Sequence, residues 1–287
     1  MSSSRLLKRR MKSAKNISQI TKAMEMVSAS KMRRSQEQAV ASRPYAEKLT
    51  IMLKNIAMHT NPSQHPLLQT HSSPKKLIVL FSTDRGLAGG LNTNLFKRSE
   101  EFVATSAVEF IVIGKKAREY AIKFGHKIVA DFSGLPEHLH FEDALPIAEV
   151  MMKGFLTGQY SEVYFLHMQF VTTLAQKPCL EHLLPLTVEQ IEQPAELITA
   201  KTEYLFEPSS STILDFLLPY YVEIETYQTL LDAKASEHSA RMVAMKNASD
   251  NAKEVVDELQ LIYNKTRQAG ITKELIEITT SALSLGS

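Results

Sequence analysis

The sequence feature that most limits the fold is a run of 50 residues, from Tyr220 to Ala269, that contains neither glycine nor proline. Glycine and proline are the strongest helix breakers, so their absence allows one continuous α-helix. At 1.5 Å per residue this helix would be about 75 Å long, more than twice the diameter of a small domain. A helix of this length extends beyond any compact core and needs a partner along its side.

The same segment follows a heptad repeat, because its contact positions alternate steps of four and three residues. Such a repeat predicts a left-handed supercoil around another helix. Small and polar residues such as Gln228 and Ser249 interrupt the seam, which weakens a dimerisation zipper but lets two helices approach closely. The predicted seam positions are Leu217, Tyr221, Ile224, Gln228, Leu231, Ala235, His238, Met242, Met245, Ser249, Ala252, Val256, Leu259, Tyr263 and Thr266.

The N-terminal segment is a second helix candidate with a strong positive charge. Residues 1–50 carry 12 Lys and Arg against 3 Asp and Glu, although the whole chain carries 33 against 31. Its apolar residues recur at helical spacing, and nothing breaks the pattern before Pro44. We therefore expect the two long helices to pair within the chain as an antiparallel coiled coil. The predicted apolar face of the first helix consists of Leu7, Met11, Ala14, Ile17, Ile20, Met24 and Val27.

Between these helices, strand patterns alternate with helix patterns, which predicts an α/β domain with a mainly parallel sheet. The predicted strands are Lys76–Thr83, Val108–Ile113, a segment near His126–Ala130, and Glu162–Phe170, with Leu180–Val188 and Thr202–Phe206 as added edge strands. The predicted helices begin near Asn92 and span Lys115–Phe124 and Phe141–Leu156.

The expected fold class is therefore α/β plus a long antiparallel α-helical coiled coil, formed by the N- and C-terminal helices around a central Rossmann-like domain. The expected divisions are an N-terminal coiled-coil helix at 1–58, the α/β domain with its linkers at 59–208, and a C-terminal coiled-coil helix at 209–287. Prolines in His59–Pro74 indicate a linker after the first helix.

Composition excludes several classes of protein. The single cysteine, Cys179, rules out an intramolecular disulfide framework and a cysteine-based zinc site. No apolar run approaches the roughly 18–20 residues that span a bilayer. The basic start lacks the apolar core of a secretory signal, and its helical pattern continues past the length of a mitochondrial presequence.

A glycine-rich loop is the sharpest local candidate for chemistry. Residues Thr83–Asn94 (TDRGLAGGLNTN) lie between a predicted strand and a predicted helix, where backbone N–H groups can bind phosphate. The spacing matches neither the P-loop nor the dinucleotide-binding fingerprint. We therefore expect a tight turn in which Asn92 or Thr93 caps the next helix.

Other candidate sites are weaker. His138 and His140 lie near Glu137, Glu142 and Asp143, but the spacing is not that of a helical metal motif, so we expect no metal site and no cofactor. No nucleophile, acid or base arrangement indicates catalysis. The basic N-terminal segment lacks the interleaved aromatic residues of single-strand nucleic-acid binders, which favours an acidic protein surface as its partner.

Both ends of the chain resemble one family. Residues 16–34 (NISQITKAMEMVSASKMRR) and Arg43-Pro44-Tyr45 resemble the N-terminal helix of the gamma subunit of F-type ATP synthase, bacterial type. Residues 237–254 and 263–278 resemble its C-terminal helix, and the loop STDRGLAGGLN resembles a family segment that commonly carries cysteine where this chain has Ala88. Pro219 departs from the family pattern, so the last helix either bends there or begins there.

The resemblance implies a central rotor shaft of a proton-translocating F-type ATP synthase, coupling rotation of the membrane c-ring to ATP synthesis or hydrolysis at the alpha/beta catalytic sites. Whether the coupled ion is H+ or Na+ stays open. The implied partners are the hexamer of alpha and beta subunits, the epsilon subunit and the c-ring, with no nucleic acid and with membrane contact only through the ring. The implied location is the cytoplasmic face of the bacterial inner membrane.

By the same resemblance the chain is not an enzyme by itself, although the assembled complex is an H+-transporting ATPase. The alternative function is a basic coiled-coil adaptor with an α/β domain that binds nucleic acid or a membrane surface. The residues that the resemblance assigns to alpha/beta contacts are Met24, Arg33, Arg34, Arg241, Gln268 and Thr272. Tyr204 and Glu207 are assigned more weakly to the c-ring or epsilon.

Overall fold

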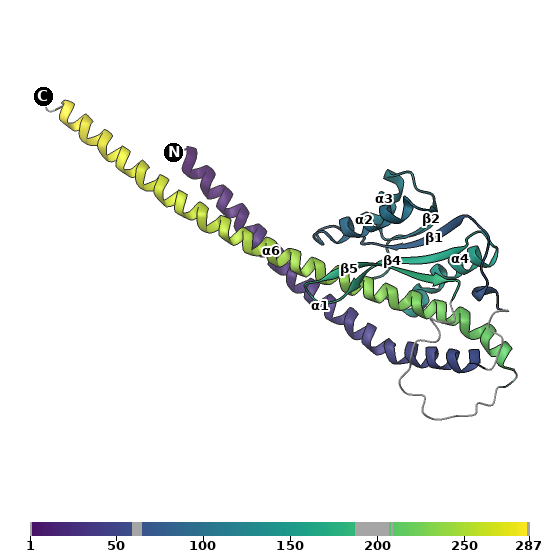
Figure 1. Cartoon of the computed structure of the whole chain (residues 1–287). Helices are drawn as coiled ribbons and strands as arrows, with labels where there is room; N and C mark the ends of the chain where they lie inside the picture. Colours follow the sequence, from purple (N-terminus) through teal and green to yellow (C-terminus); the bar gives the residue numbers. More distant parts are fainter. Residues whose placement is uncertain (1, 59–64, 187–206, 208, 286–287) are drawn as a thin grey trace. The chain divides into compact units, whose positions relative to one another are not determined.

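The computed structural model describes residues 2–58, 65–186, 207 and 209–285. Two long helices, α1 (Ser2–Met58, 57 residues) and α6 (Ser210–Leu285, 76 residues), confirm the expected N- and C-terminal helices (Figure 1). Contacts divide the chain into two compact units, residues 1–29 with 241–287 and residues 30–240. Both helices contribute to both units, and the three-part division at 58/59 and 208/209 stays a prediction.

Each long helix contains one internal proline. Pro44 lies inside α1 and Pro219 lies inside α6, nine residues after the helix begins at Ser210. The alternative in which the last helix begins at Pro219 is therefore wrong. Near these prolines, the hydroxyls of Tyr45 and Tyr220 form a hydrogen bond of 3.0 Å between the two helices.

The 30–240 unit contains a five-stranded sheet in the order β3-β2-β1-β4-β5. The strands are β1 (Lys75–Phe81), β2 (Ala107–Ile113), β3 (Ile128–Phe132), β4 (Glu162–Phe170) and β5 (Gln176–Leu184). The first four are parallel and β5 is antiparallel to β4, which confirms the mainly parallel sheet. The predicted edge strand Leu180–Val188 overlaps β5, whereas Thr202–Phe206 lies outside the described residues.

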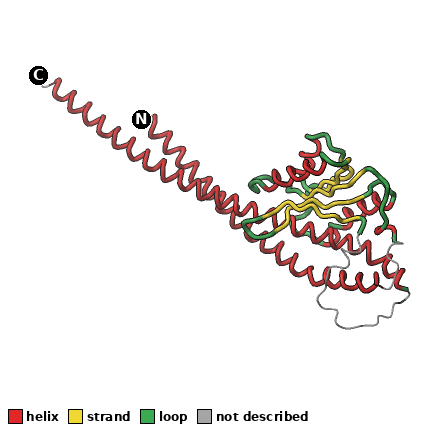
Figure 2. Tube along the Cα trace, viewed as in Figure 1, coloured by secondary structure: helices red, strands yellow, loops and turns green. Residues whose placement is uncertain are grey.

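Helices cover both faces of this sheet (Figure 2). On one face, α2 (Leu91–Val103) and α3 (Lys115–Lys123) pack against alternate strand residues such as Ile78 and Leu80. On the other, α4 (Leu145–Leu156) and parts of α1 and α6 pack against Leu77 and Val79. Because both faces are buried, the central strands carry continuous apolar runs, Leu77–Phe81 in β1 and Phe110–Ile113 in β2, rather than alternating apolar and polar residues.

The unit of residues 1–29 and 241–287 is an antiparallel helix pair with a seam of small residues. Ser18 and Ser249 bond reciprocally, since each hydroxyl donates to the other's backbone carbonyl at 3.3 and 3.2 Å. Ala14 and Ser18 are buried on α1, opposite Met245, Ser249 and Ala252 on α6. Large side chains at the serine positions would keep the two backbones too far apart for these bonds.

The predicted α6 seam is confirmed in this unit, because Met245 to Ala252 are buried at the predicted positions and Val256, Leu259, Tyr263 and Thr266 are half-buried. The predicted α1 face is wrong in part. Ile17, Ile20 and Val27 are 52%, 60% and 55% exposed, and the seam runs through Ser18 instead. The close approach of the helices selects small residues over apolar ones.

We expect Ser249→Leu to destabilise this helix pair by about 1–3 kcal/mol, because a larger side chain forces the backbones apart. Amide hydrogen exchange across residues 241–266 should become at least about fivefold faster. Lys253→Leu is the matched control, since the Lys253 side chain on the same helix is 61% exposed. Exchange as slow as in the wild type would contradict close packing at Ser249.

Candidate functional site

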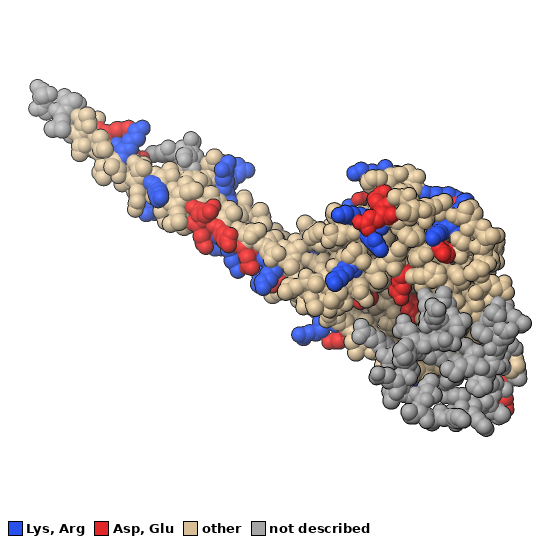
Figure 3. All heavy atoms as spheres, viewed as in Figure 1, with Lys and Arg blue, Asp and Glu red and all other residues tan. Residues whose placement is uncertain are grey.

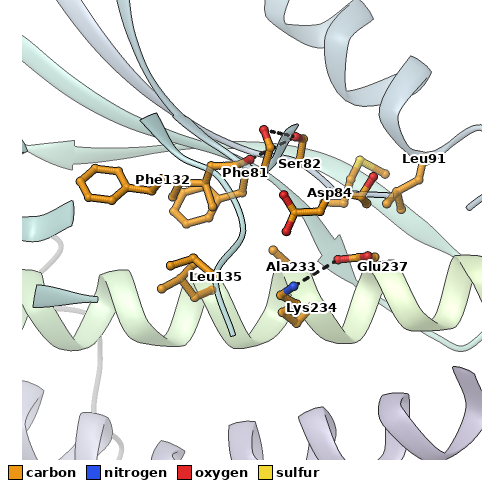
Figure 4. Close-up of a pocket in the computed structure, with 14 residues that line it drawn as sticks. Phe81, Ser82, Asp84, Leu91, Phe132, Leu135, Ala233, Lys234 and Glu237 are labelled. Carbon is orange, nitrogen blue, oxygen red and sulfur yellow. Dashed lines mark hydrogen bonds and ion pairs between the residues drawn. The ribbon is translucent and has the colours of Figure 1, made fainter. Parts of the chain in front are cut away.

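The carboxyl edge of the sheet is where α/β folds usually bind ligands, in a crevice at the point where strand order reverses. Here the crevice is lined by Ser82, Asp84 and Gly114 from the strand ends and by Leu230, Ala233 and Lys234 of α6 (Figure 4). The remaining cavity is about 20 Å³, room for about one water molecule. Small-molecule sites usually occupy hundreds of Å³, so α6 fills the space that a nucleotide would need.

The glycine-rich loop uses its polar groups to hold itself together. The side-chain amide of Asn92 donates to Thr83 Oγ1 at 2.8 Å, and Thr83 Oγ1 donates to the Arg85 carbonyl at 2.7 Å. Helix α2 has Gly90 as its N-cap residue, without a side-chain capping bond. The expected cap by Asn92 or Thr93 is therefore wrong, because the Asn92 side chain faces back to the end of β1.

Asp84 of the same loop joins three strand ends. Its Oδ1 accepts hydrogen bonds from the backbone N–H groups of Lys115, at 3.0 Å, and Gly134, at 3.1 Å. These residues follow β2 and β3, respectively. The carboxylate thus organises the loops at the carboxyl edge of the sheet.

The histidine-rich segment near residue 138 has other structural partners. Glu137 pairs with Lys31 and His238, each at 3.0 Å, and the Asp143 carboxylate accepts from the His140 backbone N–H at 2.7 Å. Within the described residues, no group of three or more His, Cys, Asp and Glu side chains has an arrangement able to hold a metal ion.

The helices of the 1–29/241–287 unit carry many exposed apolar side chains. Beyond Thr266, every described side chain of α6 is exposed, so this part of the helix is not covered by another described element. Exposed apolar side chains gathered on one element indicate an interaction surface. The large apolar residues exposed in this unit are Leu6, Ile17, Ile20, Met26, Val27, Val255, Leu261, Ile262, Ile271, Leu275, Ile276 and Ile278.

The start of α1 is basic, whereas α6 carries acidic and basic side chains next to one another (Figure 3). Basic residues gather near the start of α1, and none of them forms an ion pair with a described residue; they are Arg5, Lys8, Arg9, Arg10, Lys12 and Lys15. Acidic residues follow the exposed face of α6 at Asp250, Glu254, Asp257 and Glu258. The unpaired cations leave α1 able to bind an acidic protein surface.

The residues assigned to alpha/beta contacts fall in both units. Met24 is half-buried on α1 and Arg241 is buried on α6, with 9% exposure. Gln268 and Thr272 are exposed on one face of α6, where Thr272 Oγ1 donates to the Gln268 carbonyl at 3.0 Å. Their contact roles stay predictions.

Arg33 and Arg34 lie in the 30–240 unit, where both are exposed and neither pairs with a described acidic side chain. Glu207 is exposed, and Tyr204 lies outside the described residues.

Sequence periodicity missed the exposed surface of Ile17, Ile20 and Val27, because it assigned these residues to the seam between the two helices. The serine and alanine residues at heptad spacing were the signal for the true seam.

Among the described helices, none combines the length and apolar character needed to cross a membrane.

Comparison with solved structures supports the fold. A chain of the Euglena gracilis mitochondrial ATP synthase, in a structure of OSCP, F1 and c-ring, has a TM-score of 0.70 at 21% identity, over 99% of this chain and 95% of that one. A chain of the Tetrahymena thermophila central stalk and c-ring structure has a TM-score of 0.60 at 24% identity, over 80% and 99%.

Sequence comparison identifies the family. The family model described as ATP synthase matches residues 3–285. The ATP synthase gamma chain of Roseiflexus castenholzii is 44% identical over 99% of both chains. That of Dehalococcoides mccartyi is 41% identical over 99% of this chain and 100% of the relative. With nearly its whole length matched by the family model and by these relatives, the chain belongs to the ATP synthase gamma chain family.

Proposed function

We propose that this chain is the central rotor shaft of a proton-translocating F-type ATP synthase. It couples rotation of a membrane c-ring to ATP synthesis or hydrolysis at catalytic sites on the alpha and beta subunits. The observation that carries the proposal is the uncovered apolar surface of the long helices, in a chain that matches gamma chains over its full length. Since no described element covers the end of α6, this part of the helix is free to be enclosed by other subunits.

The mechanism follows from the asymmetry of the helix pair. The start of α1 presents cations that form no ion pair with a described residue, whereas the exposed part of α6 presents apolar side chains and charges of both signs, so a subunit around the shaft meets different chemistry at each angle. Different contacts favour different conformations of that subunit. Rotation therefore converts ion flow into successive binding, reaction and release steps at the catalytic sites.

The chain acts without a catalytic centre of its own. The crevice that would hold a nucleotide retains only about 20 Å³, and the glycine-rich loop is occupied by bonds such as Asn92 to Thr83. We expect the purified chain neither to hydrolyse ATP nor to bind it, with no saturable heat in isothermal titration calorimetry. Saturable binding would contradict this expectation and restore the loop as a phosphate site.

The residues that we propose contact the alpha and beta subunits are Met24, Arg33, Arg34, Arg241, Gln268 and Thr272. Exposure of Arg33 and Arg34 without an ion pair to a described residue supports a contact to acidic loops. Tyr204 and Glu207 are the weaker assignments, and we propose that they contact the c-ring or the epsilon subunit. The complex lies on the cytoplasmic face of the bacterial inner membrane, which the chain reaches only through the ring.

We expect Met24→Lys to reduce coupling more than folding. Met24 is half-buried, so a lysine there extends its charged end towards a partner subunit and adds an ion pair that resists rotation. Proton pumping per ATP hydrolysed should fall at least about twofold, because a close charge pair across an interface can contribute about 1.5 kcal/mol or more and would resist each rotational step. Gln19→Lys, at an exposed position of α1, is the control. An unchanged pumping-to-hydrolysis ratio would refute the contact.

Co-purification tests the proposed function directly. We expect a tagged copy of this chain, expressed in its own cells, to bring down alpha, beta and epsilon subunits in stoichiometric amounts. Recovery without them would overturn the assignment.

A further inference from the structure

The segment between β3 and α4 lies along α6 in the 30–240 unit, and we call residues Leu135–Phe141 the strap. Leu135 lines the crevice beside α6, and Leu139 is only 2% exposed. The Phe141 ring packs edge-on against Tyr220 and Tyr227, with centroids 5.7 and 5.9 Å apart. Pro136, Glu137, His138 and His140 are exposed. The strap therefore turns its apolar side chains Leu135, Leu139 and Phe141 into the packed side, with Glu137 at the edge.

Glu137 is the strap residue that joins both long helices. Its Oε1 lies 3.0 Å from Lys31 Nζ on α1 and 3.0 Å from His238 Nε2 on α6. The His238 side chain is 4% exposed, so this contact reaches into the packed side of α6. Desolvation raises the pKa of Glu137, but the hydrogen bond from Lys31 and the charges of His238 and Lys234 outweigh it and lower the pKa overall.

The remaining strap contacts to the helices are apolar, apart from the Tyr227 hydroxyl of α6, which donates to the Leu139 carbonyl at 3.3 Å. Apolar packing opposes separation of two surfaces, but it is non-directional and resists sliding or rotation weakly. Hydrogen bonds and ion pairs depend on both distance and angle, so they define a rotational position. Glu137 Oε1 is paired with Lys31 of α1 and with His238 of α6, so one carboxylate ties both helices to the loop that follows β3, whereas the Tyr227 bond reaches α6 alone.

We propose that Glu137 is a positioning residue for energy coupling, whose carboxylate holds α1 and α6 in one rotational position against the α/β domain. The inference rests on the proposed rotor function, in which torque passes between this domain and the helices. The pair matters most under load, because a half-exposed ion pair is weak and the apolar core suffices when little torque is applied.

The test uses the assembled synthase in membrane vesicles, with protons pumped per ATP hydrolysed as the readout. In Glu137→Gln we expect a wild-type ratio at the start of pumping and a fall of about twofold as the opposing gradient builds, with wild-type hydrolysis when an uncoupler removes the gradient. Glu142→Gln is the matched control, since Glu142 lies just after the strap, is exposed and has no ion pair with a described residue. A ratio equal to the wild type at every gradient would overturn the positioning role.

Variants of Lys31 separate pairing from a general loss of structure. Lys31→Gln should reproduce the load-dependent fall, whereas Lys31→Arg should retain the wild-type ratio because it keeps a cationic donor. The double variant Glu137→Gln, Lys31→Gln should be no worse than Glu137→Gln alone, since both changes remove one interaction. An additive loss would show that the residues act separately and would overturn the proposal.

Failure of this inference is distinguishable from failure of the proposed function. Wild-type vesicles that contain the chain in the complex and pump protons support the rotor function whatever the variants do. Vesicles in which the wild-type chain is absent from the complex would refute the function itself. Immunoblots of assembled complex, matched across variants, ensure that the ratios report coupling.

Discussion

Glu109→Gln is expected to lower the free energy of unfolding of the 30–240 unit by about 3 kcal/mol at pH 7. Glu109 lies at 5% exposure in β2, where it accepts hydrogen bonds from Lys75 at 2.9 Å, Lys127 at 3.0 Å and Tyr160 at 2.9 Å. Desolvation raises its pKa, but these three donors outweigh that effect and lower the pKa from 4.5 to about 2. A shift of this size corresponds to about 3 kcal/mol of stabilisation.

The lowered pKa of Glu109 also determines how the stability of the protein changes with pH. Because the folded-state pKa of Glu109 is depressed, its stabilisation is fully present above pH 4.5 and is lost as the pH falls towards 2. Urea unfolding followed by circular dichroism should therefore show a wild-type advantage at pH 7 that shrinks below pH 4.5. Glu101→Gln is the control, because its pair with Arg98 is about half exposed and should contribute less than about 1 kcal/mol. An equal loss in both variants would contradict the buried network.

Glu225→Gln is expected to act in the opposite direction and to stabilise the protein at pH 8 by about 2 kcal/mol, a figure that allows for solvent screening. Glu225 is half-buried on α6. Desolvation is the main cause that raises its pKa to about 7, and the charge of Glu181 on β5 adds to it, against a hydrogen bond with Tyr221. The native state therefore carries a carboxyl group that resists ionisation.

Above the ordinary pKa of 4.5, the unfolded chain loses this proton while the native state keeps it until about pH 7, so native stability falls across that window. Glutamine mimics the neutral acid, so the gain should be near zero at pH 4, grow between pH 4.5 and 7 and stay constant above. Glu149→Gln, on the exposed face of α4, is the control and should show no such window. A pH-independent gain would mean that Glu225 is not the titrating group.

The helix seams show how far periodicity alone is reliable. The heptad positions from Met245 to Thr266 follow from local helix geometry, and burial confirms them. On α1 the same kind of pattern selected Ile17 and Ile20, which are exposed. Two stripes at helical spacing overlap on that helix, and only the partner that packs against it determines which one is covered.

The candidate sites show a similar limit. The absence of a phosphate motif argued against nucleotide binding by the glycine-rich loop, but it did not show that α6 fills the crevice beside the loop. The acidic and histidine residues near His138 suggested, at most, a weak metal site. Glu137 instead pairs with Lys31 and His238, each about 100 residues away along the chain.

By itself, the sequence determined that this protein has two long helices, a mainly parallel α/β domain and the family to which it belongs. Helical periodicity, the alternation of strand and helix patterns, and family motifs are all visible in stretches of neighbouring residues. They can therefore be identified without knowledge of the fold. The tertiary structure alone decided which face of α1 is buried, how Asn92 and Glu137 are bonded, and what fills the crevice. Those outcomes depend on packing between segments far apart in the chain, where the size and charge of the partner select among locally equivalent choices.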